Sequence, residues 1–159
     1  MRNPAGHTLF SSIGVALIVV TAFAGELTAQ TPAPAVFPGF NADIEEATME
    51  NENFRRVIFT TEHSQLTLMS LLPGEDIGME THANADQFVR VEAGTGEVVL
   101  DGQVQGVMDG SALVIPAGIQ HNVVNTGSEP LKLYVFYTSP QHPAGAVEAT
   151  KADAAHHNH

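Results

Sequence analysis

From residue 55 to residue 139 the chain is a series of short apolar and β-branched runs, each closed by Gly, Pro, Asp or Asn. The runs include RRVIFTTE, QLTLMSLLPGE, ALVIPAG and LKLYVFYTSP, and turn signals recur every eight to twelve residues. This spacing is typical of an all-β sandwich or barrel. No long stretch with a helical period follows residue 55, so the sequence predicts an all-β domain.

The composition supports this prediction and limits the partners. The chain has 159 residues, which suits one domain, and its 14 Gly and 9 Pro suit a turn-rich fold. Acidic residues outnumber Lys and Arg by 18 to 6, which disfavours nucleic acid or an anionic membrane and favours a small-molecule ligand. Cysteine is absent, so any metal ion must be held by nitrogen and oxygen atoms.

Residues 1–29 have the layout of a secretory signal peptide. Arg2 precedes an apolar run from Leu9 to Ala24, which is shorter than the ~20 residues that span a bilayer. Small residues allow cleavage after Ala24 or after Ala29, and an uncleaved anchor or a buried helix are the alternatives. We therefore expect a periplasmic or secreted protein with no stable membrane insertion after cleavage.

Three further segments follow the predicted signal peptide. Residues 30–54 form a Pro-rich and acidic lead-in, whose acids from Asp43 to Glu52 we interpret as a solvated face. Residues 55–139 form the domain. Residues 140–159 are rich in Ala and His, and predict a flexible C-terminal tail with at most a short helix. His156, His157 and His159 belong to that tail.

Two segments of the domain contain residue types at fixed spacings. In the second segment the pattern Gly-x5-Pro-x-Gly-x2-His-x3-Asn is filled by Gly110, Pro116, Gly118, His121 and Asn125. The glycines and the proline suit turns before and after a strand ALVI. Strand alternation then places His121 on the same face as Val123 and Asn125, so His121 is expected to point into the barrel.

In the first segment Gly74, His82 and Gly94 stand at the spacing Gly-x5-His-x-His-x4-Glu-x6-Gly, with Glu80 for the first His and Gln87 for the Glu. Together the two segments resemble the paired motifs of the cupins. This resemblance covers residues 55–139 and implies the cupin double-stranded β-helix, a jelly-roll barrel of two antiparallel sheets. The stretch IGMETHANADQFVRVEAGTGEVVLDG is similar to small bacterial cupins that are loosely described as mannose-6-phosphate-isomerase-like. The four cations of the domain are few for a phosphorylated sugar.

The substitution at residue 80 preserves a possible metal site. Glu80 and His82 are two residues apart, so on a strand both side chains point to one face. With His121 they give two imidazoles and one carboxylate, the donor set of a facial triad with open positions. The sequence predicts one divalent metal ion, with iron(II) or manganese favoured and nickel, zinc or copper open. Gln87 is the predicted fourth member, as a ligand or as a hydrogen-bond donor.

Other polar residues receive weaker interpretations. Asp86 is a reserve ligand in place of Gln87. His63 is expected in an exposed turn, and Arg90 at a surface or a subunit contact. Tyr134 and Tyr137 lie on opposite strand faces, so at most one of them lines the cavity.

Two functions follow from this site. The first is an exported, metal-dependent enzyme with dioxygenase-like, isomerase or lyase chemistry on a small organic molecule. No catalytic residue beyond the metal ligands can be named. The second is a non-catalytic cupin that binds a sugar or another small ligand and whose metal is structural. Apolar residues predicted on the outer face, Phe88 and Val124, favour a homodimer.

Overall fold

The computed structural model describes residues 39–155. The predicted signal peptide and the three tail histidines from His156 onward lie outside the described residues. Neither of the two helices in the described part is long and apolar enough to cross a membrane.

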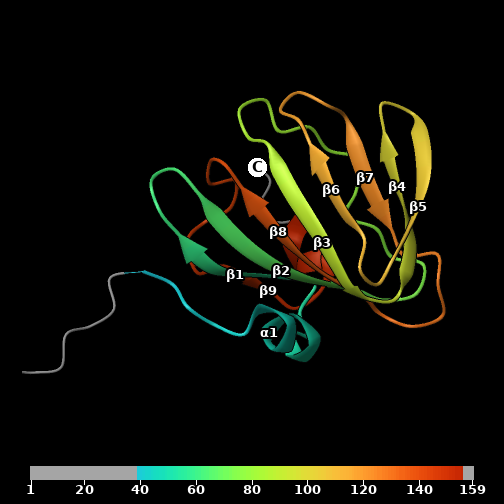
Figure 1. Ribbon diagram of the computed structural model, residues 1–159, viewed down its shortest axis with the longest axis horizontal. Helices are drawn as coiled ribbons and strands as arrows, with labels where there is room; N and C mark the ends of the chain where they lie inside the picture. Colours follow the sequence, from blue (N-terminus) through green and yellow to red (C-terminus); the bar gives the residue numbers. More distant parts are fainter. Residues whose placement is uncertain (1–38, 156–159) are drawn as a thin grey trace, which may run out of the picture. The chain divides into compact units, whose positions relative to one another are not determined.

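The strands of the described part form two antiparallel sheets, as the sequence predicted (Figure 1). The larger sheet has the order β6-β3-β8-β2-β1-β9, and the smaller has the order β5-β4-β7. The strands are β1 (Arg55–Thr60), β2 (Gln65–Leu71), β3 (Gln87–Ala93), β4 (Thr95–Leu100), β5 (Gln103–Met108), β6 (Ala112–Ile115), β7 (His121–Val124), β8 (Leu131–Tyr137) and β9 (Val147–Glu148). After β3 the chain passes to the smaller sheet for β4 and β5, returns to the larger sheet for β6, crosses again for β7 and returns for β8, as in a jelly roll.

The register of the larger sheet places a polar row at one end of its inner face. Gln87 of β3 pairs with Ile115 of β6 on one side and with Tyr137 of β8 on the other, and Tyr137 pairs with Gln65 of β2. Gln87, Tyr137 and Gln65 are all buried. Side chains alternate along a strand, so the sequence neighbours of these four paired residues point to the outer face of the sheet. They form an outward row of Val114, Phe88, Phe136 and Leu66.

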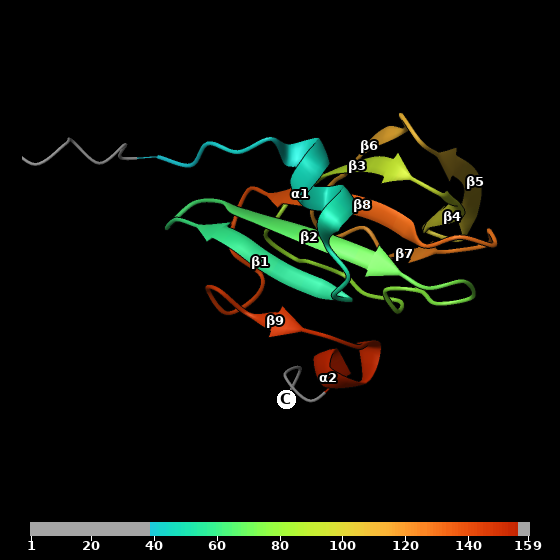
Figure 2. The same cartoon turned by 90° about the horizontal axis from the view of Figure 1, so that it is seen from below.

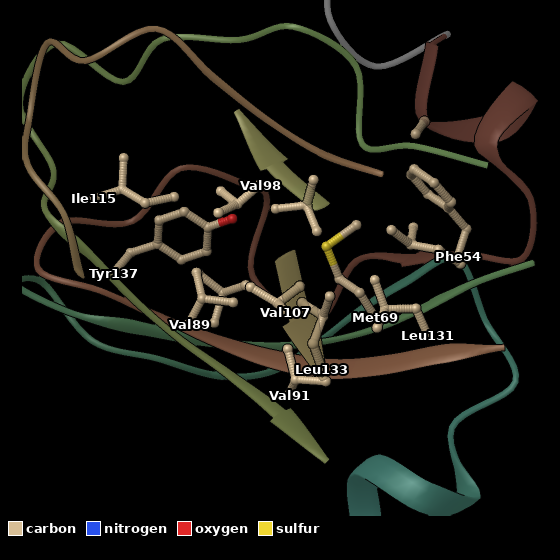
Figure 3. Close-up of a cluster of buried hydrophobic side chains, with 14 of the residues drawn as sticks. Phe54, Met69, Val89, Val91, Val98, Val107, Ile115, Leu131, Leu133 and Tyr137 are labelled. Carbon is tan, nitrogen blue, oxygen red and sulfur yellow. The ribbon is translucent and has the colours of Figure 1, made fainter. Parts of the chain in front are cut away.

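The inner faces of both sheets enclose an apolar core (Figure 3). Val89 and Val91 of β3, Leu133 of β8 and Met69 of β2 come from the larger sheet, and Val98 of β4 comes from the smaller one. Gly94 closes β3 where the backbone φ is +86°, and a Cβ atom there would lie 2.6 Å from the carbonyl oxygen of Pro130. The last glycine of the first motif is thus required by the turn and by the close approach of the next chain segment.

The acidic lead-in contains a helix that the sequence analysis did not predict. Helix α1 (Ile44–Glu50) begins at Asp43, whose side chain accepts a hydrogen bond from the Glu46 amide at 3.1 Å. It packs on the outer face of the larger sheet and buries Thr48 (Figure 2). The acids of this segment are exposed, as expected for a solvated face.

The segment predicted as a flexible tail is partly built into the fold. Strand β9 pairs with β1, and helix α2 (Lys151–Ala155) follows it and buries Ala154. Arg55 Nη1 donates a hydrogen bond to Glu148 Oε2 at 2.9 Å, and both side chains are almost fully buried. The composition of residues 140–155 does not show this pairing, because the partner strand lies about 90 residues earlier.

Candidate metal centre

The first motif runs antiparallel to β7, which brings Glu80 next to His121. The two residues exchange backbone hydrogen bonds, each 2.9 Å long. The amide of Gly118 donates to the carbonyl of His82 at 2.8 Å, so the Pro116–Gly118 turn holds the backbone at His82 in the same way. The strand expected over residues 80–82 is therefore reduced to an isolated bridge, but the side chains still converge.

Hydrogen bonds at the start of this segment also hold it in place. Asp76 accepts from Asn122 Nδ2 at 2.9 Å and from the ammonium group of Lys151 in α2. Asn125, the last residue of the second motif, donates to the carbonyls of Leu71 and Glu129 at 2.8 Å. The contact between Asp76 and Asn122 joins the first motif to β7, and the contact between Asn125 and Leu71 joins the end of β7 to the end of β2.

Glu80, His82 and His121 bring one ligand atom each into a group whose members lie within 4.8 Å of one another. Glu80 Oε1 is 3.2 Å from His82 Nε2 and 3.4 Å from His121 Nε2. Metal–ligand distances of about 2.1 Å at right angles place two donor atoms about 3.0 Å apart. The two separations from Glu80 Oε1 are close to that value, and all three ligand atoms lie within 4.8 Å of one another, so the three residues could hold one metal ion.

The orientation of His121 suits a ligand. The side chain is fully buried, and Nδ1 lies 2.9 Å from the carbonyl oxygen of Ile119. A carbonyl can only accept, so Nδ1 carries a proton, and Nε2 is the ring atom that faces the site and could bind a metal ion once it is deprotonated. The prediction that His121 points into the barrel is confirmed.

The charges of the cluster depend on one another. Burial would raise the pKa of Glu80, but hydrogen bonds from His121 and His82, with the charges of both rings, lower it to about 2. Burial would lower the pKa of His121, but the hydrogen bond with Glu80 and the bond to Ile119 raise it. A proton on His121 thus lies beside the ionised carboxylate of Glu80, and a metal ion bound there would displace it.

Gln87 lies next to the cluster, and Asp86 does not join it. The amide nitrogen of Gln87 is 2.8 Å from His121 Nε2, inside the barrel. Its role as a fourth ligand stays a prediction. The exposed Asp86 instead accepts from the Ala117 amide at 2.8 Å and links two loops at the barrel mouth.

Two residues near the cluster were missed or underrated by the sequence analysis. The ring of His142 lies edge-on to that of His82, with centroids 6.4 Å apart, and its Nε2 is 3.3 Å from the Tyr137 hydroxyl. Tyr137 is also in edge contact with His82, at 5.5 Å. His142 carries no motif signal, because it stands in the loop between β8 and β9.

The protonation of this pair follows from burial. Burial, with a smaller contribution from the positive charge of Arg55, lowers the pKa of His142 to about 4. Burial also raises the pKa of the Tyr137 hydroxyl, and the charge of Glu80 adds to this. Both groups are therefore neutral near pH 7.

A small internal cavity lies behind the cluster. Its polar lining residues are Glu80, Gln87 and Tyr137, and the rest of its wall is apolar, including Met69 and Ile115. It leaves about 10 Å³ for the centre of a water-sized molecule, which is room for about one water. A larger ligand must therefore approach from the mouth, where Glu80 and His82 are only partly buried.

The remaining candidates lie away from the cluster. His63 is highly exposed, as predicted. Arg90 is half-buried and pairs with Glu92 at 3.5 Å. Tyr134 faces outward, 6.3 Å from the Phe88 ring, so only Tyr137 lines the cavity, as the alternation predicted.

The protein is a jelly roll of two antiparallel sheets, with one carboxylate and two imidazoles clustered at one end. It therefore belongs to the class of double-stranded β-helix proteins with a candidate metal centre. The family model described as cupin domain matches residues 67–137. The chain belongs to the cupin family. The fold predicted from the two motifs is confirmed.

Relatives and solved structures agree with this membership. The chain is 50% identical to YrkC of Bacillus subtilis (strain 168) over 121 residues, which cover 72% of this chain and 65% of YrkC. It is 40% identical to L612 of Acanthamoeba polyphaga mimivirus over 114 residues, which cover 69% of this chain and 71% of L612. The structure of BH2720 from Bacillus halodurans has a TM-score of 0.72 and 47% identity, covering 79% of this chain and 96% of BH2720. The match thus spans slightly less than two thirds of YrkC and nearly all of BH2720.

Proposed function

We propose that this cupin is an exported, metal-dependent enzyme of the oxygenase type that acts on a small organic molecule. The observation that carries the proposal is the convergence of Glu80, His82 and His121 on one point, with the barrel mouth on their open side. Three protein donors leave further coordination positions for a ligand.

The protein groups set the charge and shape of the site. When bound, iron(II) or manganese(II) would supply Lewis acidity and, with iron, redox chemistry. One carboxylate against a dication leaves a net positive charge, which favours ligands with anionic or electron-rich oxygen atoms. Gln87 adds a neutral amide and so does not cancel that charge. Small molecules with two oxygen atoms placed to chelate one metal ion, such as catechols, β-diketones and 2-oxo acids, fit these conditions.

The neutral surroundings favour oxygenase chemistry over demanding acid–base chemistry. Glu80 is the only carboxylate among the residues that line the described cavity, and it is a predicted ligand. Tyr137 and His142 are neutral near pH 7 for the reasons given above. A strong general base is therefore not provided on the cavity side.

The test is metal binding followed by oxygen consumption. Protein purified without chelator is titrated anaerobically with iron(II), and oxygen uptake is then measured with the three substrate classes. We expect one equivalent of metal in the wild type, its loss in His121→Ala, and its retention in the control His63→Ala. His63 is the matched control because its side chain is 84% exposed and it is not one of the clustered residues.

Each outcome separates the candidate functions. Metal binding with oxygen uptake supports the enzyme. Metal binding without turnover supports the non-catalytic ligand-binding cupin. Full metal affinity in His121→Ala contradicts the proposed ligand set.

Export is part of the proposal and rests on residues 1–29. Cleavage after Ala24 would leave Gly25 as the first residue, and cleavage after Ala29 would leave Gln30. Mass spectrometry of protein recovered from the periplasm or the medium distinguishes these ends. An intact Met1 on cytoplasmic protein contradicts export.

A further inference from the structure

The inner polar row of the larger sheet contains Tyr137, a buried polar residue that is not one of the predicted metal ligands. Tyr137 is buried to 2% exposure beside Ile115 and Val89 (Figure 3). Its side chain also lines the small cavity that Glu80 and Gln87 line. A buried hydroxyl is normally hydrogen-bonded, and the partner seen here is His142 Nε2 at 3.3 Å. One partner leaves part of the hydrogen-bonding capacity of the hydroxyl unused.

A second buried side chain holds His142 in place. Gln65, which is fully buried, accepts from the amides of Gln141 and His142 at 3.1 and 3.0 Å. Its own amide nitrogen donates to the His142 carbonyl at 2.8 Å and to Thr60 at 3.1 Å. Three of these four hydrogen bonds hold the backbone of the loop, so the position of His142 beside Tyr137 is preorganised.

The hydrogen-bonding geometry is compatible with a donor that faces the cavity. When His142 Nε2 carries a proton, the ring donates to the Tyr137 oxygen, and the hydroxyl proton is free to point into the cavity. The cavity has room for about one water-sized group, which limits what can accept this proton.

We propose that Tyr137 is a ligand-binding residue that donates a hydrogen bond to a small acceptor atom of a ligand beside the metal centre, and that His142 is the positioning residue that orients its hydroxyl. The proposal rests on the proposed metal site and deepens it by defining the ligand class. The ligand presents one compact, electron-rich atom, such as the oxygen of a carboxylate, to the inner side of the site.

The probe for this contact is azide, a small anion whose terminal nitrogens accept hydrogen bonds. Wild type and variants are loaded with cobalt(II), and azide is titrated while the visible absorption of the cobalt ion is followed. Tyr137→Phe is expected to weaken azide binding about five-fold, the effect of one neutral hydrogen bond. Cobalt affinity and thermal stability measured beside it should stay close to wild type.

The role of His142 is tested by a non-bonding and a conservative variant. His142→Phe should weaken azide binding by a smaller factor, and His142→Gln should restore part of the loss, since an amide can still bond the hydroxyl. In the double variant Tyr137→Phe/His142→Phe the loss should equal that of Tyr137→Phe alone, because both act through one hydroxyl. Tyr134→Phe, on the outward face of the same strand, is the matched control and should bind azide as the wild type does.

Two failures are distinguishable. Wild-type protein that takes up no cobalt overturns the proposed metal site and this inference with it. Cobalt uptake with azide affinity in Tyr137→Phe within two-fold of wild type overturns the role of Tyr137 alone. Additive losses in the double variant would overturn the positioning role of His142.

Discussion

The buried ion pair between β1 and β9 gives a prediction whose size follows from its environment. Arg55 Nη1 and Glu148 Oε2 are 2.9 Å apart, and the side chains are 4% and 2% exposed. Glu148→Leu removes the acceptor and leaves the guanidinium charge in a site closed to water. Breaking such a pair from one side costs about 3–5 kcal/mol. Against a total of about 5–15 kcal/mol, this is a large part of the stability of a domain.

The assay is urea unfolding followed by circular dichroism, with a thermal scan beside it. The expected loss corresponds to roughly 10–20 °C in Tm for a domain of this size. Glu62→Leu is the matched control, because that carboxylate is 86% exposed and its replacement should change stability by less than about 0.5 kcal/mol. The double variant Arg55→Met/Glu148→Leu replaces both charges and should recover most of the loss.

The same variant connects stability with the site. Residues 138–146 join β8 to β9 and include His142, whose amide donates to Gln65. Weakening of β9 should therefore raise the hydrogen-exchange rate of the His142 amide more than that of amides in β8. A Glu148→Leu protein within about 1 kcal/mol of wild type, or a double variant no better than the single one, would refute the reasoning.

Four further predictions concern the metal centre, the loop that carries His142 and the outer face. The raised pKa of His121 means that protons compete with metal, so metal affinity, measured by competition with a chelating dye, should fall as the pH drops through that pKa towards and below 6.5. In metal-free protein, the stabilisation by ionised Glu80 is complete above pH 4.5 and is lost as the pH falls to about 2. The stabilisation by protonated His121 is complete below pH 6.5 and is lost as the pH rises through its raised pKa. Urea unfolding midpoints should therefore show the largest contribution of this pair to the free energy of unfolding between pH 4.5 and 6.5. Gln65→Leu removes the partner of the Gln141 and His142 amides and of the His142 carbonyl, and should cost at least about 1–3 kcal/mol in urea unfolding. Phe88, 39% exposed in the outward row, is the test of the expected homodimer: Phe88→Lys should shift sedimentation towards a monomer without loss of fold, and an unchanged sedimentation coefficient contradicts dimerisation through this face.

The sequence predicted the fold and the three clustered residues because both depend on short-range spacing. Two-residue alternation relates Glu80 to His82, and the fixed turn before His121 determines its direction. Helix α1 was not predicted, although Asp43 followed three residues later by Glu46 is a capping pattern. The prolines that precede this segment favoured the prediction of an extended lead-in instead.

The second part of the site could not be predicted in this way. The contact between Tyr137 and His142 depends on a loop conformation, which Gln65 fixes from a strand more than 70 residues earlier. Strand β9 has two residues, too few for any periodicity, and its place is decided by the buried partner of Glu148. Long-range register and buried polar pairing leave no local pattern in a single sequence.

The alternating rows of the larger sheet have a consequence for redesign. Strand β8 carries Tyr137 on its inner face and Phe136 on its outer face, and it lies between β3 and β2, which carry the other members of both rows. A one-residue insertion in β8 would exchange the two faces and remove the ligand-facing hydroxyl in the same step. Libraries that aim at new ligands should therefore keep the length of β8 constant and vary the loop of residues 138–146, where a change in length alters the reach of His142 and leaves the register intact.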